Sequence, residues 1–101
     1  MAAARFEAAG EGLFRVSGPL DFNSVPGVWE ASLPLLREAP SGARIDLAGV
    51  DGVDSAGLAL VLEWVGQASL AGRSLRIEGL PDKLLALARI SETEGLLQPA
   101  S

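Results

Sequence analysis

The fold is decided by one stretch of the sequence, Asp46-Leu-Ala-Gly-Val-Asp-Gly-Val-Asp-Ser-Ala-Gly-Leu58. Just before and within it, residues 44–48 have an apolar body and predict a short strand. Residues 49–54 are rich in Gly and Asp and predict a loop. From Ser55 to about Ala71 the apolar residues recur with a helical period, and Gly72 follows as the expected C-cap. A strand that continues through a loop into a helix is typical of α/β domains.

The start of this helix carries the most specific polar signal in the chain. Asp54 or Ser55 is the expected N-cap, because both side chains accept hydrogen bonds from the free backbone N–H groups of a first helical turn. Gly57 lowers helix propensity by about 1 kcal/mol relative to Ala, which suggests that something approaches the backbone there. Two interpretations stay open: the turn packs closely on its own sheet, or it meets a partner.

The rest of the chain alternates between strands and helices. Periodicity and turn residues predict strands over 5–9, 13–17 and 74–78 and helices over 24–38 and 82–90, with room for one more short strand at Leu96 and Leu97. Gly18 and Pro19 are expected to end the second strand, and Pro34 to kink or break the first helix. The predicted fold is α/β of the mixed α+β kind, a small mixed sheet with helices packed on it, in the order β-β-α-β-α-β-α(-β). Residues 1–101 would form a single domain with its core over about 5–97.

Composition argues against several classes of function. The chain has 8 basic and 13 acidic side chains and a formal charge of -5, which argues against nucleic acid or an anionic membrane as a direct partner. It has no Cys and no His, so thiol chemistry, a Ser-His-Asp triad and the commonest metal ligand are excluded. No phosphate-binding glycine motif opens a helix. We therefore expect no catalytic residues, no cofactor and no bound metal.

Hydropathy gives no sign of membrane insertion. The longest strictly apolar run, residues 58–62, is far short of the about 20 residues that cross a bilayer. The N-terminus lacks the basic start and apolar core of a signal peptide. The expected compartment is the cytoplasm, without direct membrane insertion.

The helix that begins at Ser55 has apolar residues on two sides. One side is sufficient to cover a sheet and consists of Leu58, Val61, Leu62, Val65 and Ala68. The opposite side places Leu60 and Trp64 one turn apart, beside Glu63 and Gln67. This pair either packs against a neighbouring helix or forms a patch where a partner docks, since Trp is enriched at interface hot spots.

Three segments together resemble a STAS domain, the module of sulfate transporters and anti-sigma-factor antagonists. They are Gly18-Pro-Leu-Asp21, the stretch from Ile45 to Leu58, and Leu75-Arg-Ile-Glu-Gly-Leu80. The resemblance covers about residues 13–97, and Asp54-Ser-Ala-Gly-Leu58 is its most specific piece. It implies a small mixed sheet backed by helices, which agrees with the order of elements predicted above.

Two branches of this family fit. Anti-sigma-factor antagonists carry, directly after the Asp, a Ser that a partner kinase phosphorylates, and the matching residue here is Ser55. The second branch is the MlaB-type cytosolic subunit of the Mla phospholipid-transport ABC complex. The segments that resemble it are Gly18-Pro-Leu-Asp21, Val28-Trp-Glu30, Asp54-Ser-Ala-Gly-Leu-Ala-Leu60 and Leu80-Pro-Asp-Lys-Leu-Leu-Ala-Leu-Ala88. MlaB-type proteins often have Thr where this chain has Ser55, which keeps the hydroxyl, and we favour this branch.

The MlaB-type resemblance implies a non-catalytic accessory subunit. It would bind the cytoplasmic ATPase of the transporter, stabilise its active dimer and support lipid movement between the two membranes of a Gram-negative cell, and so outer-membrane lipid asymmetry. The chain would be peripheral to the inner membrane only through this complex. The expected docking residues are Asp51, Asp54, Ser55, Ala56, Gly57, Leu60, Glu63 and Trp64, joined by Asp21, Asn23 and Trp29.

Two features qualify this surface. Trp29 is spaced from Leu33 and Leu36 as a core residue would be, so that interpretation stays open for it. Negative charge gathers at Asp46, Asp51, Asp54 and Glu63, which suggests a basic surface on the partner protein.

The antagonist branch implies a switch at Ser55. The unmodified chain would bind an anti-sigma kinase and so release a sigma factor. A phosphate on Ser55 would add about 1.5 to 2 negative charges beside Asp51 and Asp54. A partner surface shaped for a small neutral hydroxyl would not accommodate this charge, so the partner would no longer bind.

Overall fold

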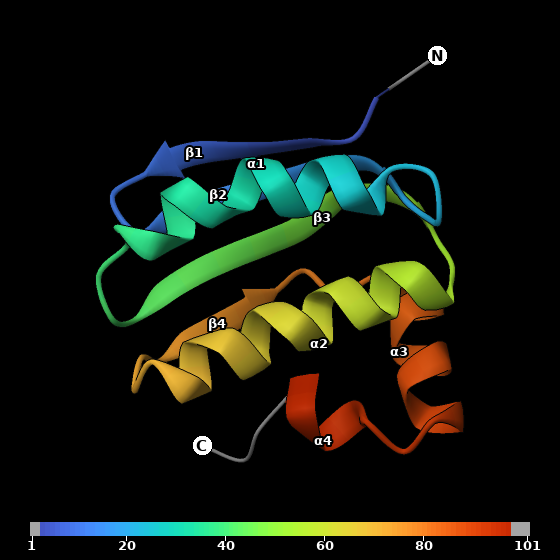
Figure 1. The fold of residues 1–101 in the computed structure, drawn as a ribbon. Helices are drawn as coiled ribbons and strands as arrows, with labels where there is room; N and C mark the ends of the chain where they lie inside the picture. Colours follow the sequence, from blue (N-terminus) through green and yellow to red (C-terminus); the bar gives the residue numbers. More distant parts are fainter. Residues whose placement is uncertain (1–2, 98–101) are drawn as a thin grey trace.

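The sheet and its helices are arranged as the sequence predicts. The computed structural model describes residues 3–97. Its elements are β1 (Arg5–Gly10), β2 (Leu13–Leu20), α1 (Val25–Arg37), β3 (Ala43–Val53), α2 (Ser55–Leu70), β4 (Leu75–Glu78), α3 (Asp82–Ile90) and α4 (Glu94–Leu97). The strand order is β1-β2-β3-β4, with β1 antiparallel to β2 and the other neighbours parallel. α1 and α2 run side by side in the same direction along the sheet, and α3 and α4 lie beside α2 (Figure 1).

The two faces of the sheet differ in chemistry. Alternate side chains of the central strands are buried under α1 and α2, among them Val16 on β2 and Ile45 on β3. The side chains between them point the other way, and several of them are charged. Arg15 Nε lies 3.7 Å from Asp46 Oδ2, and a second ion pair joins β3 to β4 on the same face. The helices therefore cover one face, and the other is polar.

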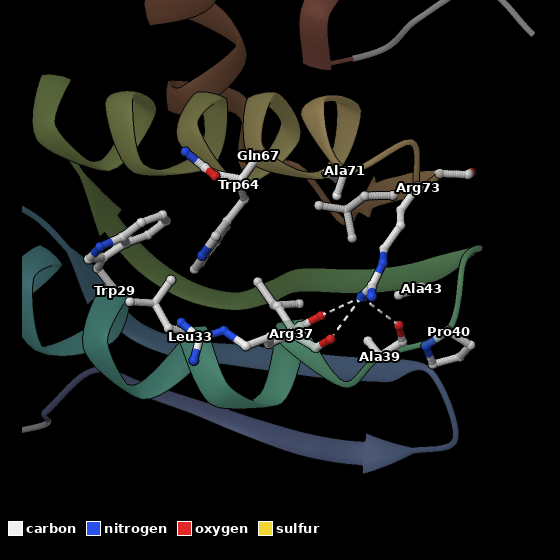
Figure 2. Close-up of a pocket in the computed structure, with 14 residues that line it drawn as sticks. Trp29, Leu33, Arg37, Ala39, Pro40, Ala43, Trp64, Gln67, Ala71 and Arg73 are labelled. Carbon is white, nitrogen blue, oxygen red and sulfur yellow. Dashed lines mark hydrogen bonds between the residues drawn. The ribbon is translucent and has the colours of Figure 1, made fainter.

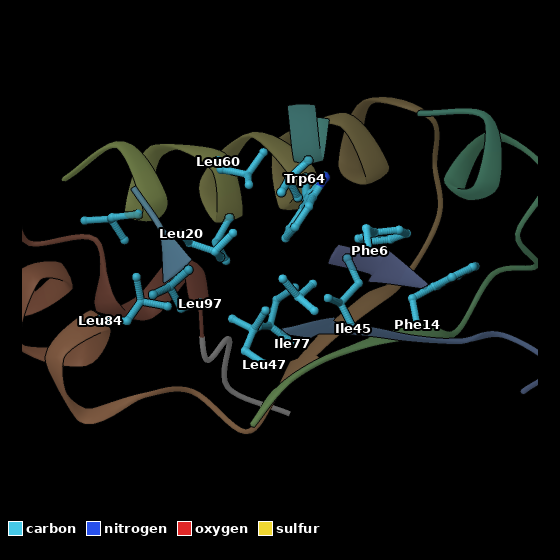
Figure 3. Close-up of a cluster of buried hydrophobic side chains, with 14 of the residues drawn as sticks. Phe6, Phe14, Leu20, Ile45, Leu47, Leu60, Trp64, Ile77, Leu84 and Leu97 are labelled. Carbon is cyan, nitrogen blue, oxygen red and sulfur yellow. The ribbon is translucent and has the colours of Figure 1, made fainter. Parts of the chain in front are cut away.

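The core lies between the covered face of the sheet and α2. The rings of Phe6 and Phe14 stack with their centroids 5.3 Å apart, and the Trp64 ring lies 5.5 Å from that of Phe6 (Figure 3). Leu84 from α3 and Leu97 from α4 are buried in the same cluster. One apolar cluster thus includes residues from almost the whole described chain.

The predicted loop over residues 49–54 is wrong, because β3 continues to Val53. The expected stop at Gly18 and Pro19 is also wrong, because β2 continues to Leu20 and pairs with this part of β3. Register shifts interrupt the pairing, and a Cβ on Gly49 would lie 3.1 Å from the Val16 carbonyl oxygen. The glycines permit close approach of two irregular strands instead of ending them.

Two further predictions need correction. α1 continues through Pro34 without a break. Because proline has no backbone N–H, the carbonyl of Glu30 loses its helical hydrogen-bond donor. Both residues are exposed, so water can replace that bond. The expected terminal strand at Leu96 and Leu97 is instead the short helix α4, which turns Leu97 into the core.

Candidate functional site

Asp54 connects the start of α2 to the loop between β2 and α1. It is the N-cap of α2, as predicted, in an extended conformation. One oxygen of its carboxylate accepts from the backbone N–H groups of Ala56 at 2.9 Å and Gly57 at 3.2 Å. The other accepts from the N–H of Phe22 at 3.0 Å, in the loop between β2 and α1. A single carboxylate thus caps α2 and fixes the neighbouring loop.

These hydrogen bonds lower the pKa of Asp54. The bond from Phe22 has the largest effect; desolvation opposes it, while the bonds from Gly57 and Ala56 and the charge of Lys83 add to it. The folded chain therefore stabilises the ionised form of the Asp54 carboxylate. At neutral pH the start of α2 carries a fixed negative charge.

The loop before α1 is held by its own hydrogen bonds. Asp21 Oδ1 accepts from the backbone N–H groups of Asn23 at 2.9 Å and Ser24 at 3.0 Å. Ser24 Oγ accepts from the Asp21 N–H at 3.0 Å and donates to the Pro19 carbonyl at 2.7 Å. Together with the bond from the Phe22 N–H to Asp54, these bonds fix the backbone of the loop from Pro19 to Ser24.

Phe22 is the functional candidate that the sequence analysis missed. Its side chain is 80% exposed although its backbone is fixed. A signal was available, since it is one of only three phenylalanines and stands between two N-cap residue types, Asp21 and Asn23. Ser55 and Asn23 are also exposed, and Asp21 is half-buried. We call Asp21, Phe22, Asn23, Asp54 and Ser55 the helix-end surface.

Gly57 is explained by packing inside the molecule. It is buried, and a Cβ there would collide with the carbonyl oxygen of Leu20 and lie 3.1 Å from the Leu20 Cβ. The first turn of α2 therefore rests directly on the end of β2. The interpretation of Gly57 as a residue that touches a partner is wrong.

The expected exposed patch at Leu60 and Trp64 is also wrong. Leu60 is 3% exposed and Trp64 is 1% exposed. Trp64 Nε1 donates to Ser32 Oγ at 2.9 Å, and Ser32 Oγ donates to the Trp29 carbonyl at 2.7 Å. Because α1 lies along this side of α2, both side chains pack between the sheet and α1.

The other predicted residues are separated by the structure. Asp51 and Glu63 are exposed and Ala56 is half-buried, so these three remain accessible. Glu63 also accepts from Gln67 Nε2 at 3.0 Å. Asp46 pairs with Arg15 on the polar face of the sheet, so it does not belong to the same cluster of charge. Trp29 is half-buried and lines a groove between α1 and α2 (Figure 2).

Two further observations concern metals and membranes. Within residues 3–97, the acidic side chains do not gather into a group of three that could hold a metal ion. Across the same residues, each helix is too short or too polar to span a bilayer.

Comparisons with known proteins agree with the STAS resemblance. The family described as "Mlab, STAS domain" matches residues 4–98. The intermembrane phospholipid transport system binding protein MlaB of Escherichia coli K12 is 36% identical over 76 residues, which cover 74% of each chain. The protein of the same name from Shigella flexneri matches to the same extent.

The fold has a solved counterpart. The anti-sigma factor antagonist SpoIIAA in its unphosphorylated form superposes with a TM-score of 0.63, over 87% of this chain and 83% of that one. The identity is 15%, so this likeness concerns the fold alone. The family match over residues 4–98 and the MlaB relatives lead to one conclusion: this chain belongs to the MlaB-type STAS family.

Proposed function

We propose that this protein is a non-catalytic accessory subunit that binds and stabilises the cytoplasmic ATPase of a phospholipid-transporting ABC complex. The relatives in E. coli and S. flexneri are named as binding proteins of an intermembrane phospholipid transport system. The observation that carries the proposal is the helix-end surface, where exposed Ser55 and Phe22 stand on a frame fixed by Asp54. Residues 1–101 act as one STAS-like module, which is held at the inner membrane only through its binding to the complex.

The helix-end surface has the chemistry of a docking site. Phe22 supplies an aromatic side chain, a residue type enriched in interfaces. Its backbone is already ordered, so binding loses little conformational entropy there. Ionised Asp54, with Asp51 and Glu63 exposed nearby along the chain, favours a partner with a basic rim around an apolar pocket. Half-buried Ala56 follows Ser55 in the first turn of α2 and extends this surface, whereas Trp29 lies in the groove between α1 and α2 and is left out of it.

Ser55→Asp tests this surface. The fold should be retained, because a negative charge at a helix N-terminus is favourable. Affinity for the co-expressed ABC ATPase, measured by biolayer interferometry, should fall by about tenfold or more, since a larger, charged carboxylate replaces a small neutral hydroxyl and would have to be desolvated in the apolar pocket. Ser69→Asp is the matched control, because Ser69 is an exposed serine near the opposite end of the same helix.

Co-purification of the tagged chain followed by mass spectrometry identifies the partner. An ABC ATPase as the main companion supports the proposal, and a serine kinase as the main companion contradicts it. Unchanged affinity in Ser55→Asp would mean that the ATPase docks elsewhere on the chain.

A second candidate function is an anti-sigma-factor antagonist that is switched by phosphorylation. The exposed hydroxyl of Ser55 favours it, because a kinase needs an accessible acceptor. A phosphate there would add about 1.5 to 2 negative charges next to ionised Asp54. Intact-mass analysis of the chain purified from its own cells tests this: a phosphorylated fraction that Ser55→Ala abolishes supports the switch, and its absence under all growth conditions rejects it.

A further inference from the structure

A groove runs between α1 and α2. It has a volume of about 260 Å³. Trp29, Leu33 and Leu36 line it from α1, while Trp64 and Ala68 line it from α2 (Figure 2). Because most of this lining is apolar, water inside the groove has few hydrogen-bond partners, and replacing it with an apolar group is favourable.

The groove has a fixed shape at the C-terminal end of α1. Arg73 Nη1 donates to the carbonyl oxygens of Leu36 at 3.2 Å, Arg37 at 2.9 Å and Ala39 at 3.0 Å. These bonds tie the segment before β4 to the end of α1 (Figure 2). The Trp64–Ser32 bond fixes the floor of the groove in the same way. A preformed site of this kind binds without first having to order its walls.

The charge of the groove differs from that of the chain as a whole. The described residues that line it include Arg37 and Arg73 and no Asp or Glu, although acidic residues outnumber basic ones in the sequence by 13 to 8. Of the ion pairs recorded among residues 3–97, none uses either arginine. Figure 2 shows the Arg37 guanidinium directed toward Leu33 and the Arg73 guanidinium over the end of α1. The groove is therefore apolar, with one positive charge on its α1 wall and another at the end near Ala39.

The length and volume of the groove fit a single acyl chain. Trp29 and Arg37 are eight residues apart on α1, or about 12 Å at the helical rise, which is comparable to a medium-length acyl chain. The volume lies near the lower end of the range for small-molecule sites, roughly 300 to 1,000 Å³. A protein partner needs about 800 Å² of its own surface, far more than this groove offers, and a lipid with two acyl chains is too large for it.

We propose that this groove binds one fatty acid anion, with its acyl chain lying over Trp64 toward Trp29 and its carboxylate next to Arg73, while Arg37 adds positive charge on the α1 wall. Arginine is suited to this role because its guanidinium remains charged and matches the geometry of a carboxylate. The proposal does not depend on the proposed function, because the groove runs along the helices and not over their N-terminal ends.

Intrinsic fluorescence can detect this binding, because both tryptophans of the chain line the groove. We expect dodecanoate brominated at its ω carbon to quench the full-length chain with saturable one-to-one stoichiometry below its micelle concentration. Dodecanoate brominated at the α carbon should quench less, because its bromine would lie near Arg73. Equal affinity for dodecylammonium would overturn the proposal, because the arginines would then play no part.

Two matched pairs of variants test the position of the ligand. Arg37→Glu should weaken dodecanoate binding by about tenfold, whereas Arg76→Glu, an exposed arginine on β4, should leave it unchanged. Ala71→Phe should fill the groove and abolish binding, whereas Ala59→Phe changes an exposed alanine of α2 outside the groove. Circular dichroism confirms that each variant folds.

Two outcomes would reject the proposal outright. One is unchanged binding in folded Ala71→Phe. The other is concentration-dependent self-association that buries Trp29 and that dodecanoate does not reverse, which would assign the groove to a second copy of the chain. Ser55→Asp should bind dodecanoate as the unmodified chain does, so failure of the docking proposal and failure of this one are distinguishable.

Discussion

Trp64 and Phe22 belong to two regions that use an aromatic side chain in opposite ways. At the contact between α1 and α2, Trp64 is 1% exposed and its indole N–H is bonded to Ser32. At the helix-end surface, Phe22 has its backbone bonded to Asp54 while its ring is 80% exposed. The first arrangement orders a side chain inside the core, and the second orders a backbone while its side chain stays exposed to solvent. Substitutions in the two regions should therefore separate stability from binding.

The largest effect is expected for Trp64→Ala. Removing a fully buried Trp lowers the free energy of unfolding by about 3 to 5 kcal/mol. This is a large share of the total, which is roughly 5 to 15 kcal/mol for a small domain. Trp29→Ala is the matched control, because this ring is half-buried and should cost less. Urea unfolding followed by far-ultraviolet circular dichroism measures both. A smaller loss for Trp64→Ala than for Trp29→Ala would mean that Trp64 is not a core residue.

Gly57 and Gly66 provide the next test, because they lie on the same helix in different surroundings. In Gly57→Ala the new Cβ meets the Leu20 carbonyl oxygen, and the displacement of the first turn should cost about 1 to 3 kcal/mol. Gly66 has open space around it, so Gly66→Ala should stabilise the chain by about 0.5 to 1 kcal/mol through helix propensity. Thermal unfolding should show changes of opposite sign. Changes of the same sign would contradict the close contact between α2 and β2.

These two tests show what the sequence can predict. The periodicity of residues 55–71 and a polar N-cap depend on local chemistry; the helix is confirmed, and of the two predicted N-caps, Asp54 and Ser55, the structure selects Asp54. The burial of Trp64 depends on α1, which is distant in sequence, so periodicity could show that Leu60 and Trp64 share one side of the helix but not what covers it. The extension of β3 through Gly49 likewise depends on its pairing with β2.

The helix-end surface could be predicted only in part. Asp54 and Ser55 follow from helix capping and from the family resemblance. Phe22 carries a weak sequence signal, but its place beside Asp54 depends on a hydrogen bond between residues 32 positions apart. A bond of that kind has no local signature in the sequence.

A smaller change in stability is expected for Asp54→Asn, with a clear dependence on pH. The folded chain lowers the pKa of Asp54, so the ionised carboxylate stabilises the fold above its ordinary pKa of about 4, and this contribution is lost as pH falls through the lowered value. Asn can still cap α2, but its NH2 group cannot accept the bond from Phe22. The Tm of Asp54→Asn should therefore be lower than that of the unmodified chain at pH 7, and the difference should shrink in acid. Asp51→Asn controls for the change in net charge, and a difference that grows in acid would contradict this account.

The smallest change in stability is expected for Phe22→Ala, together with a large change in binding. An exposed ring contributes little to folding, so the free energy of unfolding should stay within about 0.5 kcal/mol. Affinity for the ATPase should fall by about tenfold or more if the ring is the anchor of the interface. Ile90→Ala is the matched control, because Ile90 is equally exposed but lies at the end of α3. Equal losses of affinity in the two variants would show that the partner responds to general surface hydrophobicity. An unchanged affinity in Phe22→Ala would show that the helix-end surface is not part of the interface.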